Sequence, residues 1–251
     1  MKRVSLRARA AVFLRSLLLQ ASWNREGMQN LGFAFAIAPA LRELYPEGPA
    51  RTAAFRRHLA FFNTHPYAAA AILGGIVSVE ERVAAGEAPP ELATQYKQAL
   101  GPPFAALGDA FFWGALRPTA ALAGALVALV ATSARPLWAL VAFLGLYDVV
   151  HLWGRLWSFA RAYEDAEGIV EKVRRLGLPE STSLLKASGA ALAGCVAATL
   201  AISGGWPDRG HHTLLASLAL VASYLALPRL GLYATALGAI GVGVVIGALA
   251  G

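Results

Sequence analysis

Residues 119–153 decide the fold class, and they read TAALAGALVALVATSARPLWALVAFLGLYDVVHLW. Arg135 and Asp148 are the only charged side chains in this stretch, and Arg135 divides it into the apolar runs Thr119–Ala134 and Pro136–Trp153. Each run approaches the length of about 20 apolar residues that a helix needs to cross a bilayer. The stretch therefore predicts two neighbouring transmembrane helices.

The composition of the whole chain of 251 residues extends this interpretation. Charged residues make up 15% of it and hydrophobic residues 57%, whereas soluble domains carry about 25% charged residues. Three further apolar runs are predicted to span the membrane: Leu184–Ser203, Thr213–Leu227 and Arg229–Gly251. The apolar content excludes a disordered chain, and a single cysteine excludes a disulfide scaffold. We therefore expect an all-α, polytopic membrane protein.

Basic residues give the chain a net charge of +7 and crowd its N-terminus. They are Lys2, Arg3, Arg7, Arg9 and Arg15. Without interleaved aromatic residues they do not indicate nucleic-acid binding, and the positive-inside rule instead places this end in the cytoplasm. Residues 4–19 mix these charges with apolar positions, which predicts an N-terminal amphipathic helix at the membrane surface. A helix of an ordinary cytosolic domain is the alternative.

Two apolar segments, Tyr67–Val79 and Phe104–Leu116, are too short to span. Helix-breaking residues precede both segments, Thr64-His65-Pro66 the first and Gly101-Pro102-Pro103 the second. This predicts re-entrant helical hairpins, and such pairs are typical of transporters. The predicted organisation is therefore an N-terminal region (1–62), a hairpin region (63–118) and a transmembrane region (119–251). A polar segment near residues 155–183 interrupts the last region, and the charges of residues 155–175 predict a solvated helix there.

Polar side chains in apolar surroundings form three clusters. The first lies in residues 20–33 and the second at Asn63-Thr64-His65, while the third is Asp109 within an apolar hairpin. Amide and carboxylate groups suit a ligand rich in hydroxyl groups, and an acid at membrane depth is functional by default. Helix capping is the alternative explanation of the first two clusters, and a helix N-cap or an ion pair with Arg117 would explain Asp109.

Residue patterns for catalysis are missing from the sequence. The five histidines lack the spacing of a metal site, and we find no nucleophile elbow, phosphate loop or dinucleotide fingerprint. We therefore predict a protein that binds and transports, without a metal, a cofactor or a catalytic residue of its own. A membrane-embedded enzyme is the weakest alternative.

The same clusters resemble one known family. LQASWNREGMQNLGF (Leu19–Phe33), FFNTHP (Phe61–Pro66) and GDAFFWGALRP (Gly108–Pro118) are similar to three motifs of the IID membrane component of the mannose/fructose/sorbose-type sugar phosphotransferase system (PTS). Glu80-Glu81 also fits the family. The resemblance covers roughly residues 10–155 well and the remainder loosely.

The resemblance implies a subunit of a sugar permease in the bacterial inner membrane. It implies a IIC membrane partner, assembly in several copies, and phosphorylation of the sugar by separate IIB and IIA phosphocarrier proteins. It also implies substrate-binding residues, namely Glu26, Asn63, Thr64, His65 and Asp109. A second set would contact sugar or lock the hairpins, namely Trp23, Asn24, Gln29 and Asn30.

Two departures from the family pattern favour a second hypothesis. Arg25 and Gly27 flank Glu26 where the family usually has Tyr and Arg, and Pro102 and Ala106 stand where Gly is common. Loss of two glycines stiffens a turn. A regulatory or scaffold relative that does not transport sugar is therefore the alternative function.

Overall fold

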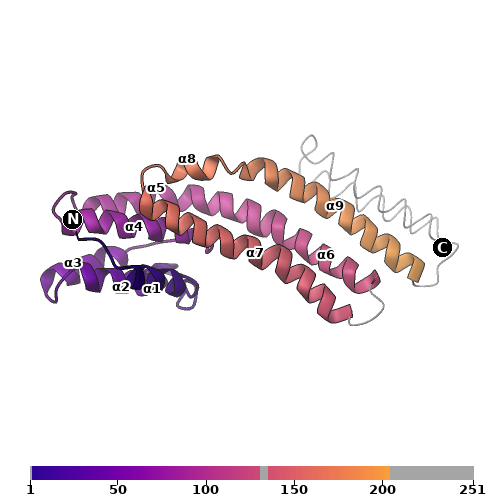
Figure 1. Cartoon of the computed structure of the whole chain (residues 1–251), viewed down its shortest axis with the longest axis horizontal. Helices are drawn as coiled ribbons and strands as arrows, with labels where there is room; N and C mark the ends of the chain where they lie inside the picture. The colour runs from indigo at the N-terminus through magenta and orange to yellow at the C-terminus, as the bar shows by residue number, and fades with distance from the viewer. Residues whose placement is uncertain (1, 131–134, 204–251) are drawn as a thin grey trace. The chain divides into compact units, whose positions relative to one another are not determined.

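The computed structural model describes residues 2–130 and 135–203, and every regular element in these ranges is helical. In chain order the elements are α1 (Leu6–Ser16), α2 (Asn30–Leu44), α3 (Pro49–His58), α4 (Ala69–Ala84), α5 (Glu91–Gly108), the π-helix η1 (Asp109–Leu116), α6 (Arg117–Val130), α7 (Arg135–Glu164), α8 (Ile169–Arg174) and α9 (Leu178–Ser203) (Figure 1). The all-α prediction is confirmed for this part of the chain. The predicted spans Thr213–Leu227 and Arg229–Gly251 lie outside the described residues.

The chain divides into two compact units. The first contains residues 1–110 and 151–178, and the second contains residues 111–150 and 179–251. The boundaries fall at the start of η1 and within α7. The end of α7 and all of α8 therefore pack with the N-terminal elements, so residues 151–178 of the predicted transmembrane region belong to the first unit.

α2 and α4 form the core of the first unit. Both are buried along most of their length, and their largest fully buried side chains include Phe33, Ile37, Ile72 and Ile76. Close backbone approach requires a glycine at Gly74, because a Cβ there would collide with the backbone of Phe159 in α7. α1 packs against α2, with Ala8 and Val12 buried at the contact. α1 lies within residues 4–19, the range of the predicted amphipathic helix; its amphipathic role and its placement at the membrane surface stay predictions.

α4 is longer than the predicted hairpin segment, which ends at Val79. The helix continues to Ala84 and buries both Glu80 and Glu81. A buried carboxylate is tolerated only when it is paired and hydrogen-bonded, and both glutamates have such partners. Tyr163 in α7 donates to Glu81 Oε1 (2.8 Å), as does the backbone N–H of Val4 (2.7 Å). The expected end of the segment before the glutamates is therefore wrong.

α5, η1 and α6 form one continuous helical stretch, Glu91–Val130. The predicted break at Gly101-Pro102-Pro103 is wrong, since these residues lie inside α5. The two proline side chains are exposed, so their rings do not disturb packing, although each removes one helix hydrogen bond. The wider turns of the π-helix begin at Asp109. The predicted short re-entrant segment Phe104–Leu116 is thus part of a longer helix.

α7 likewise exceeds its predicted length. It runs past Trp153 to Glu164, so the predicted solvated helix over residues 155–175 is divided between the end of α7 and the short α8. Two of its polar residues, Arg155 and Ser158, are buried against the first unit. That part of the prediction is wrong because those side chains have partners inside the protein.

In the second unit, small and polar residues bring the helices together. Thr119 of α6 donates to the carbonyl oxygen of Leu185 in α9 (2.9 Å). A Cβ at Gly124 of α6 would lie 3.0 Å from the carbonyl oxygen of Ala139 in α7. Small residues permit such close helix packing in lipid, where apolar side chains gain little by leaving their surroundings.

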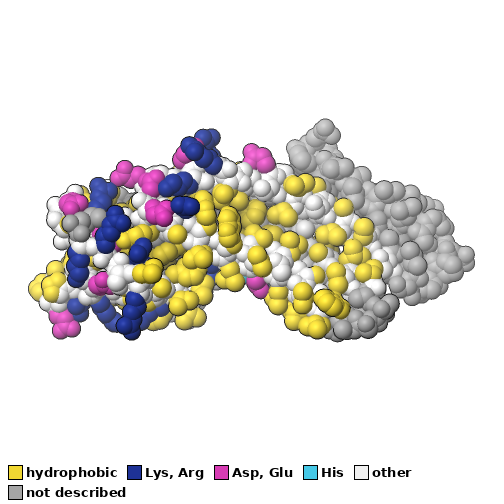
Figure 2. Space-filling model, in the orientation of Figure 1, with side chains coloured by type: hydrophobic (Ala, Val, Ile, Leu, Met, Phe, Trp, Pro, Cys, Tyr) yellow, Lys and Arg dark blue, Asp and Glu magenta, His cyan; other side chains and the backbone are white. Residues whose placement is uncertain are grey.

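Apolar side chains are exposed on the described helices of the second unit. Two helical stretches, Glu91–Val130 and Leu137–Glu164, are long and apolar enough to cross a membrane. Figure 2 shows apolar side chains over α6, α7 and α9, whereas charged side chains gather over the elements of the first unit. Trp138 and Val149 of α7 are both more than half exposed. Exposure of this kind suits contact with lipid.

Candidate functional site

A tight loop shapes the first motif. Asn24 and Met28 pair as an isolated antiparallel bridge, with Met28 in the left-handed region (φ 56°). The side chain of Asn24 accepts from the N–H of Gly27 (2.7 Å) and donates to Oδ1 of Asn30 (2.9 Å). Asn30 in turn donates to the carbonyl oxygen of Leu59 (2.7 Å). Both asparagines therefore bind backbone groups, but Asn24 does not cap α2, because the N-cap of that helix is Gln29 and makes no side-chain cap hydrogen bond.

Gln29 joins the first motif to the second. Its side-chain amide donates to the carbonyl oxygen of Thr64 (2.8 Å) and accepts from the N–H of the same residue (3.1 Å). Gln29 is buried, and its own N–H donates to the carbonyl oxygen of Phe62 (2.9 Å). The backbone N–H and carbonyl of Thr64 are thus both hydrogen-bonded by the Gln29 side chain, as they would be by a neighbouring β-strand.

Thr64 and His65 join the second motif to the third. The hydroxyl of Thr64 donates to the carbonyl oxygen of Gly101 (2.9 Å). The imidazole of His65 packs against Gly108, where a Cβ would collide with it. The contacts of Gln29 with Thr64 and of His65 with Gly108, each between residues 35 or more positions apart, therefore bring the three sequence motifs to one place in the first unit. We call Gln29, Thr64, His65, Gly101 and Gly108 the motif junction.

α7 supports the motif junction from outside the motifs. The guanidinium of Arg155, which is 5% exposed, donates to the carbonyl oxygen of Pro66 (2.9 Å) and lies 4.7 Å from the ring centre of Tyr67. His151 stacks on Tyr67 with ring centres 4.4 Å apart. Sequence reasoning missed Arg155 because it lies among the charged residues of the predicted solvated helix. The only available signal was its position after a long apolar run.

The remaining predicted site residues are exposed. Glu26 lies in the loop of the first motif, Asn63 precedes the buried Thr64, and Asp109 follows Gly108 at the start of η1. Trp23 is 52% exposed. Asn63 and Asp109 are therefore each next in sequence to a member of the motif junction, and that junction fixes their positions.

A buried ion cluster lies beside the first motif, and sequence reasoning did not predict it. The carboxylate of Glu80 accepts from Arg57 through Nε (2.7 Å) and Nη2 (2.8 Å), from the hydroxyl of Tyr45 (2.7 Å) and from Nε2 of His58 (2.8 Å). The ammonium of Lys97 lies 4.6 Å from the ring centre of Phe33. We call Tyr45, Arg57, His58, Glu80 and Lys97 the Glu80 cluster.

The Glu80 cluster holds the aromatic residues under the first motif. The ring of Phe33 contacts those of Phe62 (centres 4.5 Å apart) and His58 (5.6 Å). Phe62 is the residue whose carbonyl receives the N–H of Gln29. The cluster is therefore connected to the motif junction through the packing of two phenylalanines.

Burial and hydrogen bonding shift the titrations of these residues. Burial would raise the pKa of Glu80, but hydrogen bonds from Arg57 and His58 outweigh it and lower that pKa to about 2. Burial lowers the pKa of His58. Burial, together with the charge of Arg155, lowers the pKa of His65 to about 4. At neutral pH the site therefore contains a charged glutamate and two neutral histidines.

We expect the protein to lose stability on acidification. The pKa of His65 is lower in the folded protein than its ordinary value of 6.5. Neutral His65 therefore contributes to stability above pH 6.5, and this contribution is lost as the pH falls toward 4. The contribution of Glu80 is present above pH 4.5 and is lost as the pH falls toward 2. Thermal melts in detergent should show a midpoint that falls as the pH is lowered through this range. In His65→Gln, the free energy of unfolding lost between pH 6.5 and 4 should be smaller by an amount on the order of 2 kcal/mol. An unchanged slope in that variant would contradict the assignment.

Chemically, the motif junction offers hydrogen-bonding groups and no nucleophile paired with a base. The described residues contain no group of three or more His, Cys, Asp or Glu side chains placed to hold a metal ion. Near the motif junction, Glu26 and Asp109 present carboxylates and Asn63 presents an amide, all on a rigid base. Such a surface can bind and orient a polar ligand.

The sequence matches the family model described as "PTS system mannose/fructose/sorbose family IID component" over residues 3–203. Among similar curated proteins, the "PTS system mannose-specific EIID component" of Escherichia coli strain K12 is 44% identical over 162 residues, 64% of this chain and 56% of that protein. The "Fructose permease IID component" of Bacillus subtilis strain 168 is 33% identical over 188 residues, 73% of this chain and 67% of that protein. The matched region thus spans little more than half of the first relative.

Solved structures show the same similarity. A chain of the "CryoEM Structure of Mannose Transporter ManYZ and Microcin E492 (MceA) complex" matches with a TM-score of 0.62 and 32% identity, and the match covers 98% of this chain and 96% of that one. A second chain, described as "Structure of membrane protein", matches with a TM-score of 0.68 and 39% identity over 78% of this chain and 71% of that one.

Proposed function

The chain belongs to the mannose/fructose/sorbose family of PTS IID components, and from this premise we propose that it is a membrane subunit of a sugar-transporting permease. In this proposal it forms, together with a IIC subunit, the path that binds and translocates a hexose. Phosphorylation is left to separate IIB and IIA proteins, and the complex contains several copies of each membrane subunit. The bacterial inner membrane holds the complex, with the N-terminus of this chain in the cytoplasm.

One observation carries the proposal, namely the meeting of the three motifs at the motif junction. Gln29 of the first motif is hydrogen-bonded to Thr64 of the second across 35 sequence positions, and His65 of the second motif packs against Gly108 of the third. Such connections make a rigid base, and rigid bases orient ligand-binding groups well. We propose that Glu26, Asn63 and Asp109 contact the sugar, because they are exposed at or beside this base.

The buried members take a different part in the proposal. Thr64 and His65 are 4% and 1% exposed, so we assign them a place beside the sugar path, where they position Asn63 and Asp109. Gln29, Asn24 and Asn30 lock the backbone of the motifs. Trp23 offers an exposed indole, a surface on which a sugar ring can stack.

A scaffold role without transport is the second candidate, and the departures at Pro102 and Ala106 are its support. Against it stands the position of these changes. Both side chains are outside the junction contacts, whereas Gly101 and Gly108, the glycines that contact Thr64 and His65, are present. A strain that lacks this protein and keeps full sugar uptake would establish the scaffold role.

We expect sugar uptake to fail in the variants Asn63→Ala and Asp109→Asn. Each removes hydrogen bonds to a polar ligand, and a lost bond of this kind costs about 1–3 kcal/mol, or roughly 5- to 150-fold in transport efficiency. The measurement is uptake of labelled mannose, fructose and sorbose by cells that express the complex. Glu47→Gln is the matched control, because Glu47 is a highly exposed residue of an ion pair with Arg51.

Assembly must be measured in the same cells. Co-purification of a IIC subunit with each variant separates a binding defect from a folding defect. Normal uptake in both variants, with normal assembly, would overturn the assignment of the sugar-contacting residues.

A further inference from the structure

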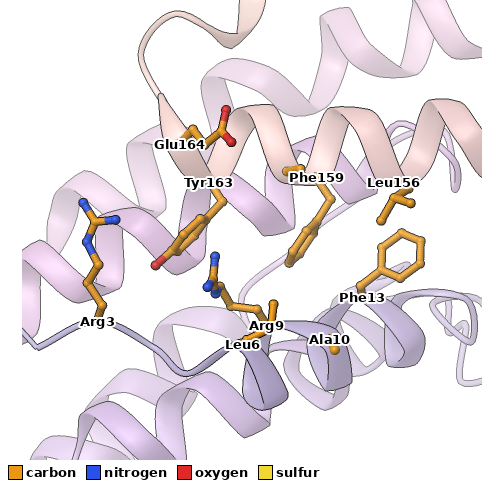
Figure 3. A pocket seen from close by; sticks show the side chains of 10 residues that line it. Arg3, Leu6, Arg9, Ala10, Phe13, Leu156, Phe159, Tyr163 and Glu164 are labelled. Atoms are coloured by element: carbon orange, nitrogen blue, oxygen red, sulfur yellow. The ribbon is translucent and has the colours of Figure 1, made fainter.

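A groove outside the three motifs lies between α1 and the end of α7, within the first unit. Its volume is about 410 Å³. Figure 3 shows Leu6, Arg9 and Phe13 on one wall and Leu156, Phe159 and Tyr163 on the other. The groove therefore combines cationic and apolar side chains, and none of its residues takes part in the proposed sugar path.

Two arginines supply the charge of the groove. Arg3 is exposed, and Arg9 places its guanidinium 4.3 Å from the ring centre of Tyr163. Nε of Arg9 is buried and has no hydrogen-bond partner within the described part of the chain. Glu164 also lines the groove, but its carboxylate pairs with Arg161 at 2.8 Å. The charged residues that line the groove, two arginines and one paired glutamate, thus give it a net positive charge, which favours an anion.

The other residues of the groove favour an acyl chain. Leu6 and Leu156 are 73% and 56% exposed, and they lie on opposite walls. Phe13 and Phe159 form an edge-to-face pair with ring centres 5.8 Å apart. A free inorganic anion would leave this apolar surface in water, whereas an amphipathic ligand covers both parts.

The length of α7 would bring the groove to the depth where lipid headgroups are found. α7 contains the membrane-length stretch Leu137–Glu164, and Leu156, Phe159 and Tyr163 occupy its last turns. A helix of that length exceeds the hydrocarbon thickness of about 30 Å at 1.5 Å per residue, so its end reaches the headgroup region. Basic residues at that level attract anionic lipids.

We propose that this groove binds an anionic phospholipid. The phosphate lies between the guanidinium groups of Arg3 and Arg9 and accepts hydrogen bonds from their terminal Nη–H groups, while one acyl chain runs along Leu6, Phe13 and Leu156. The volume of the groove holds a headgroup and the first methylene groups only, so the rest of the chains continue into the bilayer. The lipid would fasten α1 to α7 and so attach the N-terminus to the membrane.

The test uses the full-length chain purified in detergent, with phosphatidylglycerol and phosphatidylcholine added in turn. Native mass spectrometry should show phosphatidylglycerol retained in preference to phosphatidylcholine, and a thermal melt should show stabilisation by phosphatidylglycerol only. The variant Arg3→Gln/Arg9→Gln should bind phosphatidylglycerol at least tenfold more weakly, since one basic residue near an anionic surface contributes about fivefold. Arg7→Gln is the control, because Arg7 is exposed on the same helix outside the groove.

Several results would overturn the proposal. One is an equal loss of affinity in Arg7→Gln, which would indicate general charge attraction. Another is equal stabilisation by inorganic phosphate, which would indicate a site for a free anion. If the double variant does not fold, the test is to crosslink a photoactivatable phosphatidylglycerol to the unaltered protein. The lipid should label residues 3–13 and 156–164, and labelling elsewhere contradicts the site. None of these measurements depends on sugar uptake, so they stand apart from the proposed function.

Discussion

Replacing Glu80 with glutamine is expected to lower the free energy of unfolding by about 3 kcal/mol, because removal of one partner from a buried ion pair leaves the other charge uncompensated. Glu80 is fully buried and receives hydrogen bonds from Arg57, His58 and Tyr45. A glutamine supplies one acceptor oxygen in place of two and turns an N–H₂ donor toward groups that are themselves donors. The thermal midpoint in detergent should fall by about 6–12 °C for a chain of this size.

The exposed Glu47→Gln is the control for this prediction. Glu47 also pairs with an arginine, at 3.3 Å, but its side chain is 92% exposed. Surface ion pairs contribute about 0–1 kcal/mol, so this variant should melt close to the unaltered protein. A cycle with Arg57→Gln adds a second check, because the double variant should be little worse than the poorer single variant. Equal midpoints for Glu80→Gln and Glu47→Gln would contradict the importance of the Glu80 cluster.

Replacing Gly108 with alanine is expected to reduce sugar uptake at least tenfold while the protein still assembles. The new methyl group would occupy the place of the imidazole of His65, and His65 is held in turn by the N–H of Tyr67, which donates to Nδ1 (3.3 Å). Overpacking of this kind costs about 1–3 kcal/mol. The displacement passes directly to Asn63 and Asp109, the proposed contacts of the sugar, through their neighbours in sequence.

Gly145→Ala is the matched control. Gly145 is also a helical glycine, but a Cβ there meets no atom within 4 Å. This variant should transport sugar normally and assemble normally. If Gly108→Ala and Gly145→Ala transport equally well, then contact between the second and third motifs does not govern the sugar path. Co-purified IIC subunit is the measure of assembly in both.

Much of the molecule follows from local patterns along the chain. The long apolar runs on either side of Arg135 predict helices of membrane length, and the structure has α6 and α7 there. The three motifs predict membership of the family, which the comparisons confirm. Composition and nearby residues are sufficient for both conclusions, because helix formation and motif identity depend on neighbours in sequence.

The path of the backbone near Glu80 and Pro102 depends on distant residues instead. The sequence pattern predicts that an apolar segment ends at Glu80-Glu81, but distant partners such as Arg57, His58 and Tyr163 make these acids tolerable inside a helix. Pro102 and Pro103 likewise look like a break, yet their exposed position lets α5 continue. Helix boundaries here are decided by tertiary contacts that outweigh local preference.

For the candidate site, the sequence by itself determined which residue types are present and that they occur in three ordered motifs. Only the tertiary structure decided which of them build the site and which are left to bind. Gln29 and Thr64 use their polar groups on each other and on Gly101, whereas Asn63 and Asp109 remain exposed. The physical reason is that a hydrogen-bonding group is committed by whatever partner folding brings to it, and these partners are 35 or more positions away in the chain.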